Sequence, residues 1–385
     1  MTVAQREMIP LFDVEITEED LAAIEEVLRS GWLTFGPKGE AFEERFAEWL
    51  GVRHAVLVSS CTAALHLAYL AAGVGPGDEV IVPAYTFAAT AAAAVYCGAS
   101  PVFADVLGSH DLSIDPDEVR RLITPRTKAV AAVHFAGYAA PVAELVALCE
   151  EHGLALIEDA AHAPLASAGG RALGTFGLAG CFSFFSNKVL MAGEGGLVAT
   201  DDDDVAALTR RMRSHGMTAG TWDRHSGRAD GYDVVRPGFN YRYDEVRSAL
   251  LLSRLQRLTA EVAERRRLTR RYREMLGAVS GVIVPYDDDQ VTDSTCYVMP
   301  ILLEEPELQG PVRVALRERH GIQTSLFYPS THEFTAYRER WPGVELPRSE
   351  RASRTEITLP LFAHLSERDQ DRVVEALATE IRAHR

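Results

Sequence analysis

The three lysines of this chain are the first residues whose chemistry stands out. Among 39 lysine and arginine residues, only Lys38, Lys128 and Lys188 are lysines. Arginine stays protonated in proteins, whereas a desolvated lysine can lose its proton and form a Schiff base. Lys188 follows the apolar run 181–187 and precedes the glycine-rich run 193–196, whereas the other two lie in polar, turn-like surroundings. We therefore take Lys188 as the leading nucleophile, although a lysine that reaches solvent from a strand end has the same local pattern.

A turn of small residues follows the first strand pattern, at 54–58. Cys61, Thr62 and Ala63 occupy the start of the helix that comes next. Backbone N–H groups at a helix start lack partners within the helix and can bind a phosphate. An ordinary Ser/Thr N-cap has the same sequence, so this signal is weak alone.

An aromatic side chain, a carboxylate and an imidazole follow two later strand patterns. Phe87 comes after the strand at 79–82, and Asp159 and His162 come after the strand at 154–158. A carboxylate that leaves an apolar strand is costly to bury unless it meets a positive partner. Either an arginine or a protonated ring nitrogen satisfies this need. Phe87 fits either a stacking role on a flat cofactor or packing in the core.

The order of these groups along the chain indicates one cofactor. Ligands of open α/β sheets bind at the carboxyl ends of the strands, where all of these residues fall. Pyridoxal 5′-phosphate (PLP) needs amide donors for its phosphate, a stacking partner for its ring, a carboxylate for its ring nitrogen and a lysine for its aldehyde. The sequence therefore predicts a PLP site and offers no set of metal ligands.

Alternating strand and helix patterns predict the scaffold that positions this site. Apolar strands separated by helices indicate an α/β fold with a mainly parallel sheet, covered by helices on both faces. The expected strands lie at 54–58, 79–82, 101–105, 129–135, 154–158, 181–185 and 196–200. The expected helices between them lie at 62–72, 88–97, 116–123 and 141–152.

The pattern changes after residue 243. A long amphipathic helix or helix pair is expected at 244–276, and a smaller α+β unit follows it. We expect a large domain at 1–250 and a small one at 251–385, with the N-terminal segment able to pack on the small domain. Elements of the small domain are expected at 297–303 (strand), 311–320 (helix), 323–326 (strand) and from 367 (helix).

Composition and charge exclude several classes of protein. The chain of 385 residues is 47% hydrophobic and 24% charged, which is ordinary for a globular protein. Its net charge of −16 argues against an extended nucleic-acid surface, and the arginine-rich run 264–271 is interpreted as the solvent face of a helix. The acidic run 201–204 fits a helix N-terminus better than a calcium site.

Segments that would direct the chain to a membrane or an oxidising compartment are not evident. The first seven residues show no signal-peptide core, and the alanine-rich run 88–97 is too short to span a bilayer. The five cysteines are scattered without zinc or disulfide spacing. We therefore expect a cytoplasmic enzyme that binds neither membrane nor nucleic acid.

Across nearly its whole length the chain resembles the DegT/DnrJ/StrS family of fold-type I, PLP-dependent nucleotide-sugar aminotransferases. The matching motifs lie at 31–37, 58–66, 77–83, 158–163, 182–188, 193–196 and 238–242. One departure is Cys61, where many members have glycine, which would matter only if the turn required a positive φ. Lys188 supports transamination, because members that act as sugar 3-dehydratases tend to carry histidine at this position.

The resemblance implies a role for each matching residue. It makes Lys188 the Schiff-base lysine, Asp159 the partner of the pyridine nitrogen and Phe87 the stacking aromatic. Asn240 is implied to reach the phosphate in the neighbouring subunit, which predicts a homodimer with shared active sites. The remaining implied contacts are Cys61, Thr62, Ala63 and Ser183 to the phosphate, His162 beside the ring hydroxyl, and Tyr328 and His332 to the sugar.

The resemblance also implies a ping-pong transamination. L-glutamate or L-glutamine would donate an amino group to a keto-sugar, most simply a nucleotide-linked keto-deoxysugar. A free keto-cyclitol of the inosose type is the first alternative acceptor, and a PLP-binding regulatory protein without turnover is the second. A Rossmann oxidoreductase is disfavoured, since the first strand is not followed by G-x-G-x-x-G.

Overall fold

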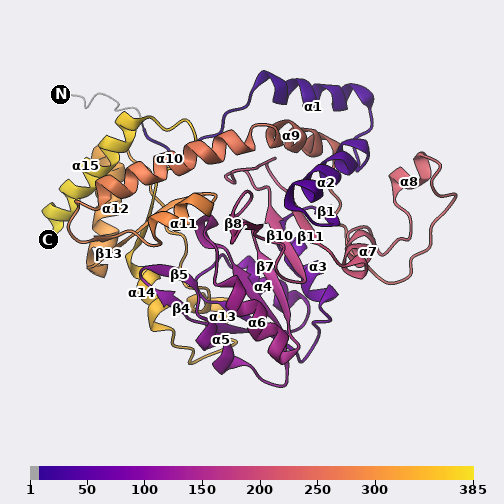
Figure 1. Cartoon of the computed structure of the whole chain (residues 1–385), viewed down its shortest axis with the longest axis horizontal. Coiled ribbons are helices and arrows are strands. Elements are labelled where there is room, and N and C mark those ends of the chain that lie inside the picture. The colour runs from indigo at the N-terminus through magenta and orange to yellow at the C-terminus, as the bar shows by residue number, and fades with distance from the viewer. Residues whose placement is uncertain (1–7) are drawn as a thin grey trace.

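The computed structural model describes residues 8–385, so the first seven residues and the predicted absence of a signal-peptide core there lie outside the described residues. A seven-stranded sheet forms the centre of the molecule (Figure 1), in the order β1-β11-β10-β7-β6-β2-β3. β11 pairs antiparallel with both of its neighbours, and the other pairings are parallel. The strands are β1 (His54–Val58), β2 (Glu79–Pro83), β3 (Ser100–Ala104), β6 (Thr127–Val133), β7 (Ala155–Asp159), β10 (Ala179–Ser183) and β11 (Gly196–Thr200).

Helices cover both faces of this sheet, as the sequence predicts. Successive strand residues point to opposite faces, and both faces are apolar: Val80 and Val82 pack with α3, whereas Ile81 packs with α6. The helices of this part are α2 (Pro37–Leu50), α3 (Cys61–Ala71), α4 (Ala89–Tyr96), α5 (Pro116–Leu122), α6 (Val142–His152) and α7 (Asp203–Met212). α7 begins at the acidic run, where Asp202 accepts hydrogen bonds from the amides of Asp204 and Val205.

The seven predicted strands are confirmed, with boundaries that differ by at most two residues. Two short hairpins were not predicted, because strands of two to four residues carry too little alternation to detect. They are β4 (Val106–Gly108) with β5 (Asp111–Ile114), and β8 (Ser167–Ala168) with β9 (Arg171–Ala172).

A second unit follows the sheet. The predicted helical region is a pair, α9 (Glu245–Leu255) and α10 (Leu258–Leu276), and α10 leads from the large sheet towards the second unit (Figure 1). A three-stranded sheet, β12-β13-β14, forms its centre. The elements of this unit are β12 (Val282–Ile283), α11 (Asp288–Asp293), β13 (Met299–Leu303), α12 (Gln309–His320), α13 (Thr335–Arg338), α14 (Pro347–Thr355), β14 (Glu356–Leu359) and α15 (Glu367–His384).

The prediction of a strand at 323–326 is wrong. The segment forms only an isolated bridge, between Ser325 and Thr358. The chain does not continue along β14, because it crosses to the large sheet, where the amide of Thr331 donates to the carbonyl of Ala84 at 2.7 Å. The sequence analysis did not predict strand β14. In the structure β14, rather than 323–326, pairs with β13 in the small sheet.

The N-terminal segment contacts both units. Ile9 pairs with Ile322, and the amide of Leu361 donates to the carbonyl of Leu11. α1 (Glu18–Ser30) then packs on α9; it begins with a capping box formed by Thr17 and Asp20. Within residues 8–385, no helix is long and apolar enough to cross a membrane.

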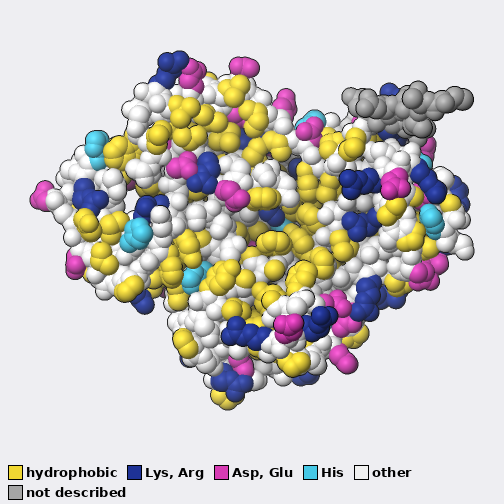
Figure 2. Space-filling model, turned by 180° about the vertical axis from the view of Figure 1, so that it is seen from behind, with side chains coloured by type: hydrophobic (Ala, Val, Ile, Leu, Met, Phe, Trp, Pro, Cys, Tyr) yellow, Lys and Arg dark blue, Asp and Glu magenta, His cyan; other side chains and the backbone are white. Residues whose placement is uncertain are grey.

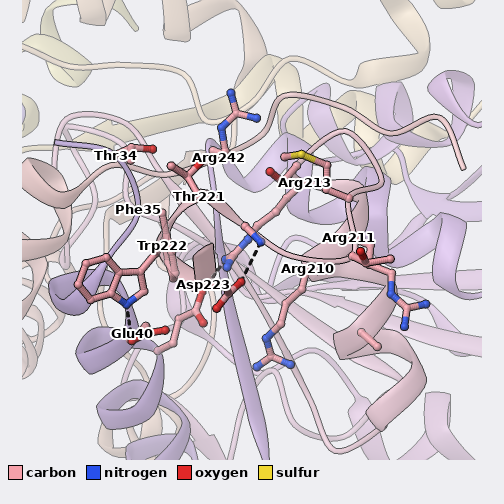
Figure 3. Close-up of a pocket in the computed structure, with 16 residues that line it drawn as sticks. Thr34, Phe35, Glu40, Arg210, Arg211, Arg213, Thr221, Trp222, Asp223 and Arg242 are labelled. Atoms are coloured by element: carbon pink, nitrogen blue, oxygen red, sulfur yellow. Dashed lines mark hydrogen bonds and ion pairs between the residues drawn. The ribbon is translucent and has the colours of Figure 1, made fainter. Parts of the chain in front are cut away.

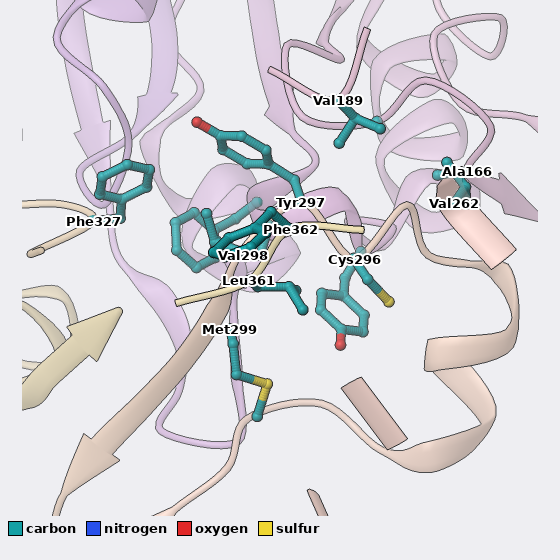
Figure 4. Packing of buried hydrophobic residues seen from close by; sticks show 14 of the residues in the cluster. Ala166, Val189, Val262, Cys296, Tyr297, Val298, Met299, Phe327, Leu361 and Phe362 are labelled. Atoms are coloured by element: carbon teal, nitrogen blue, oxygen red, sulfur yellow. The ribbon is translucent and has the colours of Figure 1, made fainter. Parts of the chain in front are cut away.

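A continuous hydrophobic core joins the two units. Tyr297, Met299, Phe327 and Phe362 pack closely where the small sheet meets the large one (Figure 4). The same cluster extends to Phe182 on β10. Residues of the second unit are therefore held firmly against the carboxyl ends of the large sheet's strands.

Candidate active site

Lys188 lies in a cavity of about 390 Å³ between the large sheet and the second unit. Most of the residues that the sequence singled out line this cavity, although they come from strand ends far apart in the chain. They are Cys61, Thr62, Phe87, Asp159, His162, Ser183, Lys188 and Tyr328. The carboxyl ends of β1, β2, β7 and β10 therefore converge as the α/β rule requires.

The first turn of α3 forms one wall. Ser60 is the N-cap, and its Oγ accepts a hydrogen bond from the amide of Ala63 at 3.1 Å. In the described part of the chain, the amides of Cys61 and Thr62 have no protein acceptor, which leaves them free for a phosphate. Cys61 starts the helix with ordinary φ, so its replacement of glycine causes no strain.

Gly196 on β11 makes room for this turn. A Cβ atom at Gly196 would lie 2.2 to 2.4 Å from backbone atoms of Ser60 and Cys61. Any larger residue would push the helix start away from the sheet. The close packing leaves the two free amides facing the cavity at a helix N-terminus, where the helix dipole favours an anion.

Asp159 presents a buried carboxylate at the end of β7. Its side chain is only 6% exposed, and burial raises the pKa of this carboxyl above its ordinary 3.8. Oδ2 accepts from Thr90 Oγ1 at 2.7 Å, and Oδ1 accepts from the amide of Ala161 at 3.2 Å. Within residues 8–385 no arginine pairs with it. A buried carboxylate without a salt bridge, with Lys188 as the cation near it, fits a site for a protonated ring nitrogen.

Lys188 has the environment of a nucleophilic lysine. Its Nζ lies 4.4 Å from the centre of the Tyr297 ring, and its side chain faces the cavity. Burial lowers the pKa of Lys188 from 10.5 to about 8. About a tenth of the amine is therefore unprotonated at pH 7, far more than for an ordinary lysine, and this is the form that nucleophilic attack requires.

His162 and Tyr328 form a hydrogen-bonded pair in the wall of the same cavity. His162 Nδ1 accepts from the amide of Ala136 at 3.2 Å, so the ring proton sits on Nε2, which lies 3.1 Å from the Tyr328 hydroxyl. Burial lowers the pKa of His162 well below 6.5, which keeps the ring neutral. The pair therefore presents a neutral N–H and a phenol to the cavity.

Three predicted site residues lie elsewhere. The Ala63 amide is already bonded to Ser60. Asn240 is exposed, and its backbone forms a bridge with Ser214 outside the cavity. His332 is buried and does not line the cavity; its Nε2 lies 3.4 Å from Glu350.

The sequence analysis missed two residues that contact the side chains of Asp159 and Lys188. Thr90 bonds Asp159, and its place one turn after Phe87 in an alanine-rich helix start was an available signal. Tyr297 lies under Lys188 but comes from the second unit, more than 100 residues away in the chain. No local spacing reports such a contact.

A second cleft of about 390 Å³ lies between α2 and α7, and it is rich in arginine (Figure 3). Arg210, Arg211 and Arg242 point in different directions, and Arg213 Nη1 pairs with Glu43 at 2.5 Å. The guanidinium groups do not converge on one point. The cavity of Lys188 is therefore the better candidate for chemistry.

Comparison with known proteins agrees with this assignment. Residues 14–378 match the DegT/DnrJ/EryC1/StrS aminotransferase family. The spore coat polysaccharide biosynthesis protein SpsC of Bacillus subtilis is 36% identical over 369 residues, which is 94% of each chain. The aminotransferase TlmJ of Streptoalloteichus hindustanus superposes with a TM-score of 0.90 at 34% identity, covering 98% of this chain and 100% of its own.

A further solved structure contains the cofactor. The PLP form of the putative sugar aminotransferase Spr1654 of Streptococcus pneumoniae superposes with a TM-score of 0.89 at 25% identity, covering 98% of this chain and 99% of its own. The chain belongs to the DegT/DnrJ/EryC1/StrS family and is a PLP-dependent sugar aminotransferase. The free amides at Cys61 and Thr62, the unpaired Asp159 and the buried Lys188 fit PLP.

Proposed function

We propose that this enzyme transfers an amino group from L-glutamate or L-glutamine to a nucleotide-linked keto-deoxysugar by ping-pong transamination. The observation that carries the proposal is the placement of Lys188 and Asp159 in one cavity, the first with a lowered pKa and the second without a salt bridge. When bound, PLP supplies an aldehyde and an electron-accepting ring through which amino groups are exchanged.

Lys188 and Asp159 are the proposed catalytic residues. The Lys188 amine would bind the cofactor aldehyde and, once released, move the proton of the donor's Cα as general base and acid. Asp159 would hold the proton of the pyridine nitrogen, which ends the isolation of its buried charge. Thr90 would orient the carboxylate through its 2.7 Å hydrogen bond.

The other lining residues would bind and orient. Cys61 and Thr62 would hold the phosphate through their amides, with Ser183 adding a hydroxyl from β10. Phe87 would cover the ring, and His162 would lie beside the ring hydroxyl. Ala63 would help to shape the helix turn that holds the phosphate. On the sugar side, Tyr328 lines the cavity and would contact the substrate directly. His332 does not line the cavity and could act there only indirectly.

Capture of PLP should depend on pH through Lys188. Because the amine is the reactive form, the rate of PLP binding to the cofactor-free protein should rise about tenfold per pH unit and level off above pH 8, at the pKa of about 8. Stopped-flow absorbance at a fixed PLP concentration measures this rate. A rate that still rises steeply beyond pH 9.5 would show that Lys188 keeps its ordinary, higher pKa.

We also propose a homodimer with shared active sites. Phe87 and Phe185 line the cavity, yet they are 59% and 43% exposed. Figure 2 shows the molecule from behind the view of Figure 1, and hydrophobic side chains gather across the middle of this face. A second copy would cover such a face, and exposed Asn240 would then reach the partner's phosphate site.

Mixed dimers test this arrangement. Lys188→Ala and Asn240→Ala should each be nearly inactive alone. A subunit with Asn240→Ala keeps its own Lys188, so pairing with Lys188→Ala should restore one site in each mixed dimer, or roughly a quarter of wild-type activity after random exchange. Recovery is measured after the two variants are co-refolded. No recovery, with mixed dimers verified by differential tags, would contradict the shared site.

The acceptor is tested by direct competition. A panel of nucleotide-linked 3-keto- and 4-keto-6-deoxysugars and the free keto-cyclitol scyllo-inosose are offered to the enzyme with L-glutamine or L-glutamate. The proposal expects amination of a nucleotide-linked sugar at a kcat/KM at least about a hundredfold above that of the cyclitol. Turnover of the free cyclitol alone would support the cyclitol alternative instead.

We further propose a division into a large domain at 1–250 and a small one at 251–385. The boundary falls within α9, before α10 leads the chain to the small sheet. The bonds of Ile9 and Leu11 support packing of the N-terminal segment on the small domain. We propose a cytoplasmic location, which suits a nucleotide-linked substrate and five buried, free cysteines.

A further inference from the structure

The backbone of Phe327 is held by two side chains, one from each unit, that the proposed chemistry does not use. Its amide donates to Glu356 Oε2 at 2.8 Å, and its carbonyl accepts from the Tyr85 hydroxyl at 2.5 Å. Glu356 lies on β14 of the small sheet, whereas Tyr85 follows β2 of the large sheet. Both side chains are at most 1% exposed. The backbone of Phe327 thus links the two units through hydrogen bonds.

Glu356 is an unusual residue for this position. Its carboxyl group is fully buried, and burial raises its pKa to about 8, although the charge of nearby Arg313 acts in the opposite direction. Its only hydrogen-bond partners in the described chain are the Phe327 amide and Thr358 Oγ1, at 2.5 Å from Oε1. A buried carboxyl is costly, and packing alone would be served by an apolar residue. Its two directed contacts suggest a geometric task.

That task concerns the next residue in the chain. Phe327 packs into the core beside Tyr297 (Figure 4), while Tyr328 turns into the cavity. The Tyr328 hydroxyl meets His162 Nε2 at 3.1 Å, and the ring lies 5.7 Å from that of Phe87. A shift of the Phe327 peptide would therefore move the phenol away from both neighbours.

We propose that Glu356 and Tyr85 are positioning residues, which hold the Phe327 peptide between the two units and so fix Tyr328 and the His162 N–H over the cavity. This inference rests on the proposed function, because the cavity is the site that binds cofactor and substrates. Neither residue touches the cavity contents itself; each acts through the peptide. A displacement of about 1 Å in such a group can cost up to a hundredfold in rate.

Two substitutions at Glu356 separate its hydrogen bonding from simple packing. Glutamine keeps the shape, accepts from the Phe327 amide through Oε1 and donates to Thr358, so Glu356→Gln should preserve both hydrogen bonds. Glu356→Leu keeps the volume and removes both contacts. Tyr85→Phe removes only the hydroxyl that holds the carbonyl. Glu380→Leu is the matched control, since Glu380 is also buried in the second unit but pairs with Arg319 and His320 instead.

The variants are compared in two measurements on the PLP-loaded full-length protein. The first is the half-saturating concentration and the maximal rate of the absorbance change with L-glutamate and with L-glutamine. The second is the pH midpoint of the visible absorbance of bound PLP without any donor, which needs no turnover. Melting temperatures show which variants are merely less stable.

We expect Glu356→Leu and Tyr85→Phe to raise the half-saturating donor concentration about tenfold or more, with a smaller effect on the maximal rate. We expect both to shift the pH midpoint, because His162 loses its hydroxyl partner. Glu356→Gln and Glu380→Leu should match wild type in both measurements. The proposal is overturned if Glu356→Leu behaves as wild type, if Gln is as impaired as Leu, or if Glu380→Leu produces the same changes.

The two measurements also separate this inference from the proposed function. If wild-type protein binds PLP but neither donor changes its spectrum, the transamination with these donors is refuted. The pH midpoints then still decide whether Glu356 and Tyr85 position the site. If Glu356→Leu does not fold, Tyr85→Phe decides the question, because it removes one oxygen atom and leaves the core filled.

Discussion

Replacement of Lys188 with alanine is expected to abolish turnover, with a loss of roughly 10⁴-fold or more in kcat. No other lysine can substitute, because Lys38 and Lys128 do not line the cavity. The variant should still bind PLP through the Cys61 and Thr62 amides and Asp159, although more weakly. Steady-state amination of the accepted keto-sugar measures the loss.

Lys188→Arg is the matched control for charge. Arginine restores a cation of similar length but cannot give up its proton, so it should be as inactive as alanine. Substantial turnover by either variant would refute the assignment of Lys188 as the nucleophile and proton carrier.

Replacement of Asp159 with asparagine is expected to lower kcat by about a hundredfold or more, because the amide cannot hold a proton on the ring nitrogen. The shape and the hydrogen bond to Thr90 are preserved, so the variant should remain folded. Rapid-mixing kinetics of the donor half-reaction measure the effect. Thr90→Val, which removes only the hydrogen bond, should cost much less, and equal losses in the two variants would indicate that orientation rather than charge matters.

The pH behaviour of stability follows from the same carboxyl group. Because burial raises the pKa of Asp159 in the folded, cofactor-free protein, its contribution to stability falls as the pH rises from the ordinary value of 3.8 through the raised value. A bound cation relieves this cost. PLP should therefore stabilise the wild-type protein more than the Asp159→Asn variant.

Residues at strand ends could be predicted from the sequence because the chemistry is local there. Asp159 is recognisable as a carboxylate leaving an apolar strand, and Lys188 as a retained lysine in an arginine-rich chain. The sheet itself followed from alternating apolar strands and helices. Of the three amides predicted for the phosphate, however, only those of Cys61 and Thr62 are free, because the Ala63 amide donates to the Ser60 side chain. That bond depends on the rotamer of Ser60, which cannot be read from the sequence.

Contacts between the two units could not be predicted in the same way. Tyr297 meets Lys188, and Glu356 meets Phe327, only because the small sheet packs on the large one. The same long-range packing draws 323–326 out of a regular strand. His332 was expected at the substrate but lies against Glu350 and outside the cavity lining, within the 3₁₀ turn Thr331–Glu333.

The most direct test of the central claim is the absorbance spectrum of the purified protein with PLP, recorded before and after L-glutamate or L-glutamine is added. Lys188→Ala is measured alongside. The account predicts a yellow wild-type protein whose visible band is lost with one donor, and a variant that shows neither the same band nor the change. A wild-type protein that binds no chromophore, or a variant that responds to the donor as wild type does, would contradict it.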